Sequence, residues 1–395
     1  MLNIVLCFHV HQPYRLKNRG LLDLSAQGDI FDDELNRAVV QRVTRTCYHP
    51  ASSLFLGLID RYGSGFKCSF SMTGTAVEQL RLWGPGALER FQKLADTGSV
   101  EFIGETYYHS LFSLFDREEF VEQVRMHAAM MESEFKTKPE VFRNTELLYD
   151  DRVSDFISPF DQYSVLLCED VVTDLPAIRK PLMSYNGLHF LLLRDHRLTD
   201  DIAFRFSDRA WSEYPLSAEK YVTWLENIVE SEERDGFVTI YLDFETFGEH
   251  HKTSTGIFQF FADLAEIILN STHLRFSWPS ESRVPVTADL TKISVRDPVS
   301  WADSGKDLSA WLSSDLQRNA MNTLLEMMER IRRKGDRGLL EKVRRLSSSD
   351  HLYHMYPWSG GADAEVHRYF SPYDSPEDAY IRYINALTVL EMRLS

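Results

Sequence analysis

The sequence is poor in cysteine, and the few cysteines it has are widely spaced. Four occur among 395 residues, at Cys7, Cys47, Cys68 and Cys168. No pair has the Cys-x-x-Cys spacing, so the pattern predicts neither a zinc site nor a disulfide framework. Free cysteines are typical of a reducing compartment, and we therefore expect a cytoplasmic protein.

Basic residues are also scarce relative to acidic ones. The 43 Lys and Arg residues stand against 59 Asp and Glu residues, which gives a net charge of −16. Nucleic-acid binding requires a basic face, and anionic membrane surfaces attract basic segments. We therefore expect no nucleic-acid and no membrane partner, whereas an uncharged ligand such as a sugar is compatible with this charge.

Long apolar runs are missing. The apolar start of the chain, from Leu2 to Phe8, is too short to span a bilayer. No basic stretch or small-residue cleavage site surrounds it, so we expect no signal peptide. The run is typical of a buried strand, and we find no internal repeat and no low-complexity segment.

Short apolar or β-branched runs instead alternate with long amphipathic stretches, which predicts strands and helices in turn. This order favours a mainly parallel sheet with right-handed crossovers. Seven strands favour a closed or nearly closed barrel, and a doubly wound open sheet is the alternative. The expected strands are 3–8, 66–72, 100–103, 141–144, 164–168, 190–193 and 238–244, and the clearest helices are 87–97, 117–135 and 218–232.

The pattern changes after Trp278. Residues 280–300 contain prolines and small polar residues and are typical of a connection. Residues 312–346 are almost continuously helical in pattern, interrupted mainly by Gly335 and Gly338, and residues 379–393 predict another helix. We therefore expect a barrel domain at 1–285 and a helical subdomain at 286–395.

Polar clusters follow several predicted strands, at the edge where parallel barrels carry their functional residues. His9 and His11 share strand parity after the first strand. Glu105 and Glu146 follow the third and fourth strands. Asp243 lies in an apolar strand, where a carboxylate is costly unless it is paired or functional.

Each cluster also allows a structural interpretation. A lone His near a strand end is more often structural than functional, and Glu146 could simply favour a helix N-terminus. Glu245 shares a strand face with Asp243, so the two carboxyl groups are expected to perturb each other's pKa. Carboxylates, imidazoles and aromatic rings together are nevertheless what a sugar-cleaving pocket requires.

In chain order, these clusters resemble the motifs of glycoside hydrolase family 57. The first motif is similar to His11-Gln12-Pro13, and the second is similar to the Gly104–His109 run. The third resembles residues 142–147, which contain Glu146, and the fourth resembles residues 241–248, which contain Asp243. The fifth candidate runs from Trp301 to Trp311. The form of the motifs most resembles the α-amylase branch of the family.

This resemblance implies an incomplete seven-stranded (β/α)7 barrel, an α-glucan or maltooligosaccharide substrate and a site without a metal ion. It implies that Glu146 is the nucleophile of a retaining reaction and that Asp243 is the acid/base. Asp243 must then hold a proton near neutral pH, through burial or through repulsion by Glu146 or Glu245. The residues expected to bind substrate are His9, His11, Glu105, His109, Trp301 and Trp311, although the two tryptophans could equally be core aromatics.

Three other functions stay open. A 4-α-glucanotransferase would use the same site. A metal-dependent carbohydrate enzyme could bind its ion through ligands among His9, His11, Asp243, His250 and His251. A non-catalytic glucan-binding protein could keep the fold alone. Residues 16–48 could be a lid or a simple helix.

Overall fold

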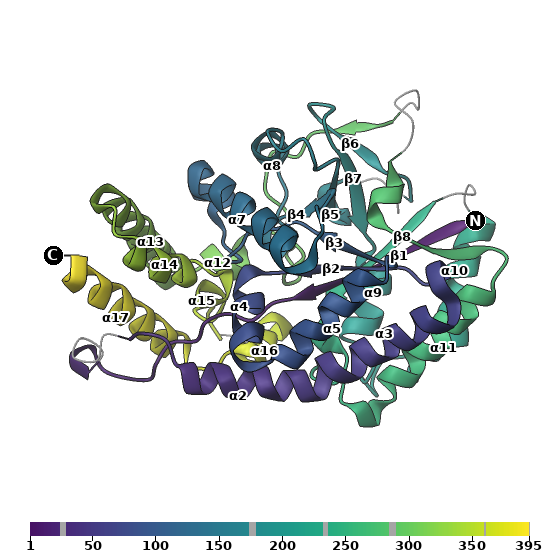
Figure 1. Ribbon diagram of the computed structural model, residues 1–395, viewed down its shortest axis with the longest axis horizontal. Helices are drawn as coiled ribbons and strands as arrows, with labels where there is room; N and C mark the ends of the chain where they lie inside the picture. Colours follow the sequence, from purple (N-terminus) through teal and green to yellow (C-terminus); the bar gives the residue numbers. More distant parts are fainter. Residues whose placement is uncertain (24–28, 174–178, 232–235, 284–289, 359–360, 395) are drawn as a thin grey trace.

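A mostly parallel sheet wrapped by helices forms the centre of the chain (Figure 1). The computed structural model describes residues 1–23, 29–173, 179–231, 236–283, 290–358 and 361–394. Among these residues, no helix is long and apolar enough to cross a membrane. All four cysteines are free and buried.

The first strand, β1 (Leu2–Val10), lies at the middle of the sheet. It runs parallel to β8 (Phe237–Asp243) along most of its length, and its second half pairs with β2 (Cys68–Met72). Its first half pairs with β9 (Leu274–Ser277). All nine residues of β1 are buried, which explains why its sequence is mostly apolar rather than alternating, with Asn3 and His9 as the polar exceptions.

The remaining strands continue around a barrel. They are β3 (Val100–Ile103), β4 (Val141–Arg143), β5 (Val165–Glu169) and β7 (Phe190–Arg194), with parallel pairs β2–β3, β4–β5, β5–β7 and β7–β8. The seams β3–β4 and β7–β8 are thin, since a single residue pair forms each. The predicted α/β class and incomplete seven-stranded barrel are therefore confirmed, and all seven predicted strands are present.

Three short strands were not predicted. β6 (Leu182–Ser184) is antiparallel to β7, and β10 (Lys292–Ile293) pairs with β6, so the two extend the sheet beyond the barrel. β9 is the third. Strands of two to four residues leave too little sequence for an alternation pattern to be recognised.

Helices cover the outside of the barrel, and the three helices named above are confirmed. They are α5 (Pro85–Asp96), α7 (Arg117–Phe135) and α10 (Ala218–Ser231). The second has the predicted bounds, the first is shifted slightly at both ends, and the predicted end of the third at residue 232 lies outside the described residues. The Asp116 side chain caps α7 by accepting from the Glu119 N–H. The other helices of this layer are α2 (Asp33–Val43), α3 (His49–Tyr62), α4 (Gly74–Trp83), α6 (Phe112–Phe115), α8 (Asp151–Ile157), α9 (His196–Ala203) and α11 (Ile257–Asn270).

Apolar clusters pack the barrel against its helices and fill its interior, and a further cluster joins strands β4, β5 and β7 to the C-terminal helices. A large cluster between strands and helices contains Phe8, Phe55, Phe70 and Phe261, and a smaller one fills the barrel interior. The interior cluster includes Val5, Cys7, Ile103, Val141, Leu167 and Tyr241. For residues 16–48, the sequence left two possibilities, a lid or a simple helix. Among the residues described, this segment contains α2 and a π-helical turn at Thr44–Tyr48.

Most of the C-terminal helices lie on one side of the barrel, at the left in Figure 1. Gly335 ends α13 with a φ of 76°, so the predicted break is real. The predicted boundary between residues 285 and 286 lies outside the described residues. The helices are α12 (Ser309–Leu312), α13 (Asp315–Lys334), α14 (Arg337–Leu346), α15 (Ser349–Tyr353), α16 (Gly361–Phe370) and α17 (Pro376–Leu394).

Candidate active site

The polar residues predicted from the sequence meet at the C-terminal end of the barrel. The parallel register sets His9 of β1 opposite Asp243 of β8 and Ser71 of β2. Glu105 and Glu146 follow β3 and β4. Strands far apart in the sequence therefore bring their terminal side chains to one place, as is usual for parallel barrels.

Glu146 lies in a tight turn directly after β4. Its φ is 57°, a left-handed conformation that residues with a side chain rarely adopt. The turn is held by Asn144, whose side chain accepts from the Thr145 N–H and donates to the Leu148 carbonyl. Strained backbone of this kind persists where the surroundings fix it, and it concentrates at functional sites.

Three donors converge on the Glu146 carboxylate. His109 Nε2 lies 3.1 Å and Ser349 Oγ 2.7 Å from Oε1, while Trp301 Nε1 donates to Oε2 at 2.7 Å. Burial alone would raise the pKa of Glu146, but His109, the positive charge of Arg143 and Trp301 lower that pKa to about 2. Glu146 is therefore an anion across the whole physiological pH range.

A chain of alternating charges leads to this carboxylate. Arg143 Nη1 donates to Glu105 Oε2 at 3.1 Å, and Ser71 Oγ donates to Glu105 Oε1 at 2.6 Å. His109 bridges Glu105 and Glu146, through Nδ1 at 3.5 Å and Nε2 at 3.1 Å. Burial lowers the pKa of His109, but the two carboxylates outweigh it and raise the pKa to about 9. The imidazolium thus locks Glu105 and Glu146 in position.

Asp243 has a very different environment. Within the described part of the chain, its carboxyl group receives no hydrogen bond. Burial, and secondly the negative charge of Glu146, raise the pKa of Asp243 to about 6. Asp243 is therefore partly protonated near neutral pH.

Glu245 lies behind Asp243 in the core of the same segment. The Tyr48 hydroxyl and Gln12 Nε2 donate to its Oε1. Burial, and secondly the charge of Asp243, raise the pKa of Glu245 to about 8. Of the two carboxylates expected to perturb Asp243, Glu146 has the larger effect, and Glu245 itself responds to Asp243.

His9 and His11 stack with His109 to line one wall of the site. The ring centroids of His9 and His11 lie 4.9 and 4.2 Å from that of His109. His11 bonds Thr73 through Nδ1 and Asp350 through Nε2, at 2.9 and 2.8 Å. His9 Nε2 is buried and has no hydrogen-bond partner among the residues that the structure describes. Burial lowers the pKa of both His9 and His11.

The remaining predicted residues are divided between the site and other parts of the fold. Trp301 joins the site through its bond to Glu146, whereas the Trp311 ring is fully buried in the apolar core of the C-terminal helices. Trp311 therefore offers no face to a sugar, which matches the alternative that it is a core aromatic. His251 is buried and bonds Ser207 and the carbonyls of Ile202 and Ala203, away from the carboxylates, and the His250 ring packs on Phe370.

Three further residues of this site received no role from the sequence. Arg143 belongs to the third motif, but the motif assigned it no function. Ser349 and Asp350 lie on α15, more than 200 residues after Glu146 in the chain. A Ser-Ser-Asp run after a helix is ordinary capping chemistry. The sequence therefore gave no signal that distinguished Ser349 and Asp350 as site residues.

His9, Glu105 and His109 could in principle bind a metal ion, because their donor atoms lie within 4.8 Å of one another. Both oxygens of Glu105 already accept hydrogen bonds, from Ser71 and Arg143. The Arg143 guanidinium is buried and would repel a second cation next to it. The donor set therefore fits a network of charged side chains better than a metal centre.

Comparisons with known proteins show which family this chain is similar to. The glycosyl hydrolase family 57 model matches residues 5–290. A Methanocaldococcus jannaschii protein with the provisional name alpha-amylase is 38% identical over 403 residues, spanning 96% of this chain and 82% of that protein.

Two solved structures share the fold at low sequence identity. A family 57 branching enzyme from Thermococcus kodakaraensis has a TM-score of 0.69 at 14% identity and covers 92% of this chain and 88% of its own. A 4-alpha-glucanotransferase from Thermococcus litoralis has a TM-score of 0.60 at 16% identity and covers 90% of this chain and 51% of its own.

Proposed function

Because the chain belongs to glycosyl hydrolase family 57, we propose that it hydrolyses α-glucans with retention of configuration, in the manner of an α-amylase. The chain is a glycoside hydrolase by family, and the finer assignment is our proposal. In it, Glu146 is the nucleophile and Asp243 is the acid/base.

The opposite proton affinities of two carboxyl groups at one barrel end are the observation that carries this proposal. A retaining glycosidase needs one ionised carboxylate and one protonated carboxyl on either side of the scissile bond. The pKa of Glu146 is lowered to about 2 and that of Asp243 is raised to about 6, partly by the charge of Glu146. Such a divergence is what assigns acid and base roles to paired carboxyl groups.

The reaction proceeds in two balanced steps. Glu146 attacks the anomeric carbon while Asp243 gives its proton to the leaving glycosidic oxygen, which departs as an alcohol. The glycosyl-enzyme ester is then attacked by water, whose proton passes to Asp243 as the bond to Glu146 breaks. Each step restores the protonation state that the other requires.

The proposed substrate-binding wall of the site is formed by His9, His11, Glu105, His109 and Trp301. Within the described ranges His9 Nε2 has no hydrogen-bond partner, which suits a hydrogen bond to a sugar hydroxyl. His109 and Trp301 hold Glu146. His11 and Glu105 support this wall through Asp350 and Arg143.

We also propose that the chain divides into a barrel at 1–285 and a helical subdomain at 286–395 that completes the cleft. Supporting contacts run from the later residues to the barrel residues. Trp301 and Ser349 bind Glu146, and Asp350 binds His11. A cytoplasmic location stays a prediction.

A glucanotransferase is the second candidate, because the same ester can be attacked by a sugar hydroxyl instead of water. The fold is shared with a branching enzyme and a 4-alpha-glucanotransferase, and the fold alone does not distinguish the acceptor. Chromatography of the products of a single maltooligosaccharide separates the two, since a transferase yields chains longer than the starting material.

The direct test is release of reducing sugar from soluble starch and from a defined maltooligosaccharide, with Glu146→Gln as a parallel sample. We expect turnover by the natural chain, insensitive to excess chelator, and none by the variant. Binding without any turnover would favour a glucan-binding protein, and loss of activity on chelation that zinc restores would favour a metal enzyme.

A further inference from the structure

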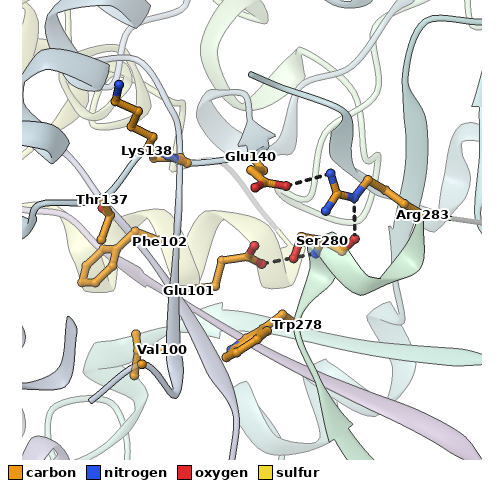
Figure 2. A pocket seen from close by; sticks show the side chains of 11 residues that line it. Val100, Glu101, Phe102, Thr137, Lys138, Glu140, Trp278, Ser280 and Arg283 are labelled. Carbon is orange, nitrogen blue, oxygen red and sulfur yellow. Dashed lines mark hydrogen bonds and ion pairs between the residues drawn. The ribbon is translucent and has the colours of Figure 1, made fainter. Parts of the chain in front are cut away.

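A cavity of about 300 Å³ opens at the end of the barrel opposite the candidate active site (Figure 2). It is lined from residues 98–102 at the start of β3, residues 137–140 before β4, and residues 278–283 after β9. We call it the basal cavity. Its volume lies at the lower end of the range of about 300–1,000 Å³ that is usual for small-molecule sites.

Trp278 presents a fixed aromatic ring to the basal cavity. Its indole N–H donates to the Ser99 carbonyl at 3.2 Å, and Lys67 Nζ lies 4.2 Å from the ring centroid. Figure 2 shows the ring beneath the Glu101 side chain, between Val100 and Ser280. The ring is therefore oriented before any ligand arrives, which lowers the entropic cost of packing a ligand against it.

The charged side chains of the basal cavity balance one another. Glu101 and Glu140 are matched by Lys138 and Arg283, and Arg283 Nη1 lies 2.8 Å from Glu140 Oε2. Because burial raises the pKa of Glu101 to about 7, the lining carries a small positive charge at most, which gives little advantage to a phosphate and none to a polyamine. It favours an uncharged ligand that both donates and accepts hydrogen bonds.

Glu101 forms the polar floor of the basal cavity. It shares strand parity with Ile103, which packs inside the barrel, so Glu101 reaches toward the barrel interior from below. Its Oε2 accepts from the Ser280 N–H at 3.2 Å. Burial raises the pKa of Glu101 to about 7, so its carboxyl group can donate or accept near neutral pH, as sugar hydroxyls do.

The basal cavity is separate from the candidate active site. Glu101 lies on β3, and Glu105 of that site follows the strand four residues later, which is about 13 Å at the usual strand rise of about 3.3 Å per residue. The interior residues Cys7, Ile103 and Tyr241 fill the barrel between the two ends. None of the proposed catalytic or substrate-binding residues lines the basal cavity.

We propose that the basal cavity is an accessory, non-catalytic binding site for a neutral sugar, a terminal residue of an α-glucan chain. The sugar would stack on Trp278 and bond the Glu101 carboxyl group. This identification of the sugar rests on the proposed function. The site would hold substrate near the enzyme without cleaving it.

The test uses the full chain with Glu146→Gln to prevent turnover and with its seven tryptophans replaced by 5-fluorotryptophan. Fluorine NMR then follows each ring during titration with maltotetraose, and Trp278→Phe and Trp301→Phe assign the two relevant signals. We expect saturable shifts of both signals. Glu101→Leu should weaken the Trp278 response by about tenfold, the scale of one hydrogen bond to a charged group, and Glu122→Leu on the exposed face of α7 should not.

The two signals make the failures distinguishable. A shift of Trp301 with a stationary Trp278 overturns the accessory site while the proposed function stands. A shift of Trp278 alone supports the accessory site and counts against the proposed function. A Trp278 signal that inorganic phosphate moves and maltotetraose does not would overturn the sugar assignment, and so would two stationary signals.

Discussion

The two sides of the candidate active site shift the pKa of a carboxyl group in opposite directions. On the β4 side, Glu146 accepts bonds from His109, Trp301 and Ser349, and its pKa falls to about 2. On the β8 side, Asp243 has no such donors among the described residues, and its pKa rises to about 6. Burial raises the pKa of both carboxyl groups. The hydrogen-bond donors around Glu146 therefore account for the difference between the two pKa values.

The comparison also shows where the donors come from. Trp301 and Ser349 follow the barrel in the chain, and only His109 belongs to a barrel loop. His109 lowers the pKa of Glu146 most, Arg143 comes next, and Trp301 adds a smaller effect. Residues after the barrel therefore supply two of the three hydrogen-bond donors to Glu146. The predictions below test the difference between the two carboxyl groups.

Removal of the carboxylate on the β4 side should have the largest effect. Glu146→Gln keeps the shape but cannot form the ester, so we expect kcat to fall by at least about 10⁴-fold, as for loss of other covalent nucleophiles. Steady-state kinetics on a maltooligosaccharide measures this. Glu249→Gln, which removes a carboxylate paired with Arg42 outside the site, should retain activity. Equal losses in the two variants would contradict the assignment.

On the β8 side, Asp243→Asn should reduce kcat by about 10²–10⁴-fold, the usual contribution of general acid–base catalysis. An aryl α-glucoside with a good leaving group needs no proton in the first step, so glycosyl-enzyme formation from it should be largely restored. Pre-steady-state release of the aryl alcohol checks this. The same loss with both kinds of leaving group would argue that Asp243 is not the acid.

The pH profile of kcat/KM should be asymmetric, because the pKa values of Glu146 and Asp243 are shifted in opposite directions. Asp243 must be protonated in the first step, so kcat/KM should fall as the pH rises through about 6. Glu146 must be ionised, and its pKa of about 2 predicts no acid limb until well below pH 4. A profile flat from pH 5 to 8, or an acid limb near the ordinary glutamate pKa, would contradict the comparison.

Ser349→Ala removes one donor from Glu146 and should reduce kcat about tenfold, the value of one hydrogen bond to a charged group. The acid limb should also move to higher pH, because the pKa of Glu146 rises when a donor is lost. Ser347→Ala is the matched control, since that hydroxyl bonds the Arg344 carbonyl instead. A lower kcat with an unmoved acid limb would indicate a merely structural role for Ser349.

The smallest expected effect is that of pH on the free energy of unfolding, through His109. The pKa of His109 is raised to about 9 in the fold, so its contribution is complete below the unfolded value of about 6.5 and is lost as the pH rises through 9. The free energy of unfolding should decrease over this interval by on the order of 1 kcal/mol or more. Urea denaturation at several pH values measures it, and the decrease should be smaller in His109→Gln.

The sequence was sufficient to predict seven barrel strands and most of the barrel residues that meet at the candidate site, with Arg143 as the exception. Apolar runs such as 3–8 and 238–244 are buried on both faces, so hydrophobicity alone reveals them. His9, Glu105, Glu146 and Asp243 each follow or end such a strand, and parallel topology then brings them together.

What the sequence could not supply depends on tertiary contacts. Trp301 and Trp311 looked alike in sequence, yet one bonds Glu146 and the other is fully buried in a core. Ser349 and Asp350 became site residues only because α15 packs against the barrel end. The short strands β6, β9 and β10 exist because neighbouring strands offer them partners.

The most direct test of the account is mass spectrometry of the natural chain after reaction with a fluorinated α-maltosyl fluoride, which slows hydrolysis of the glycosyl-enzyme. The account predicts one added glycosyl group per chain, on the peptide that contains Glu146. A label on Asp243 or on any other residue, or steady turnover of the reagent with no label, would contradict it.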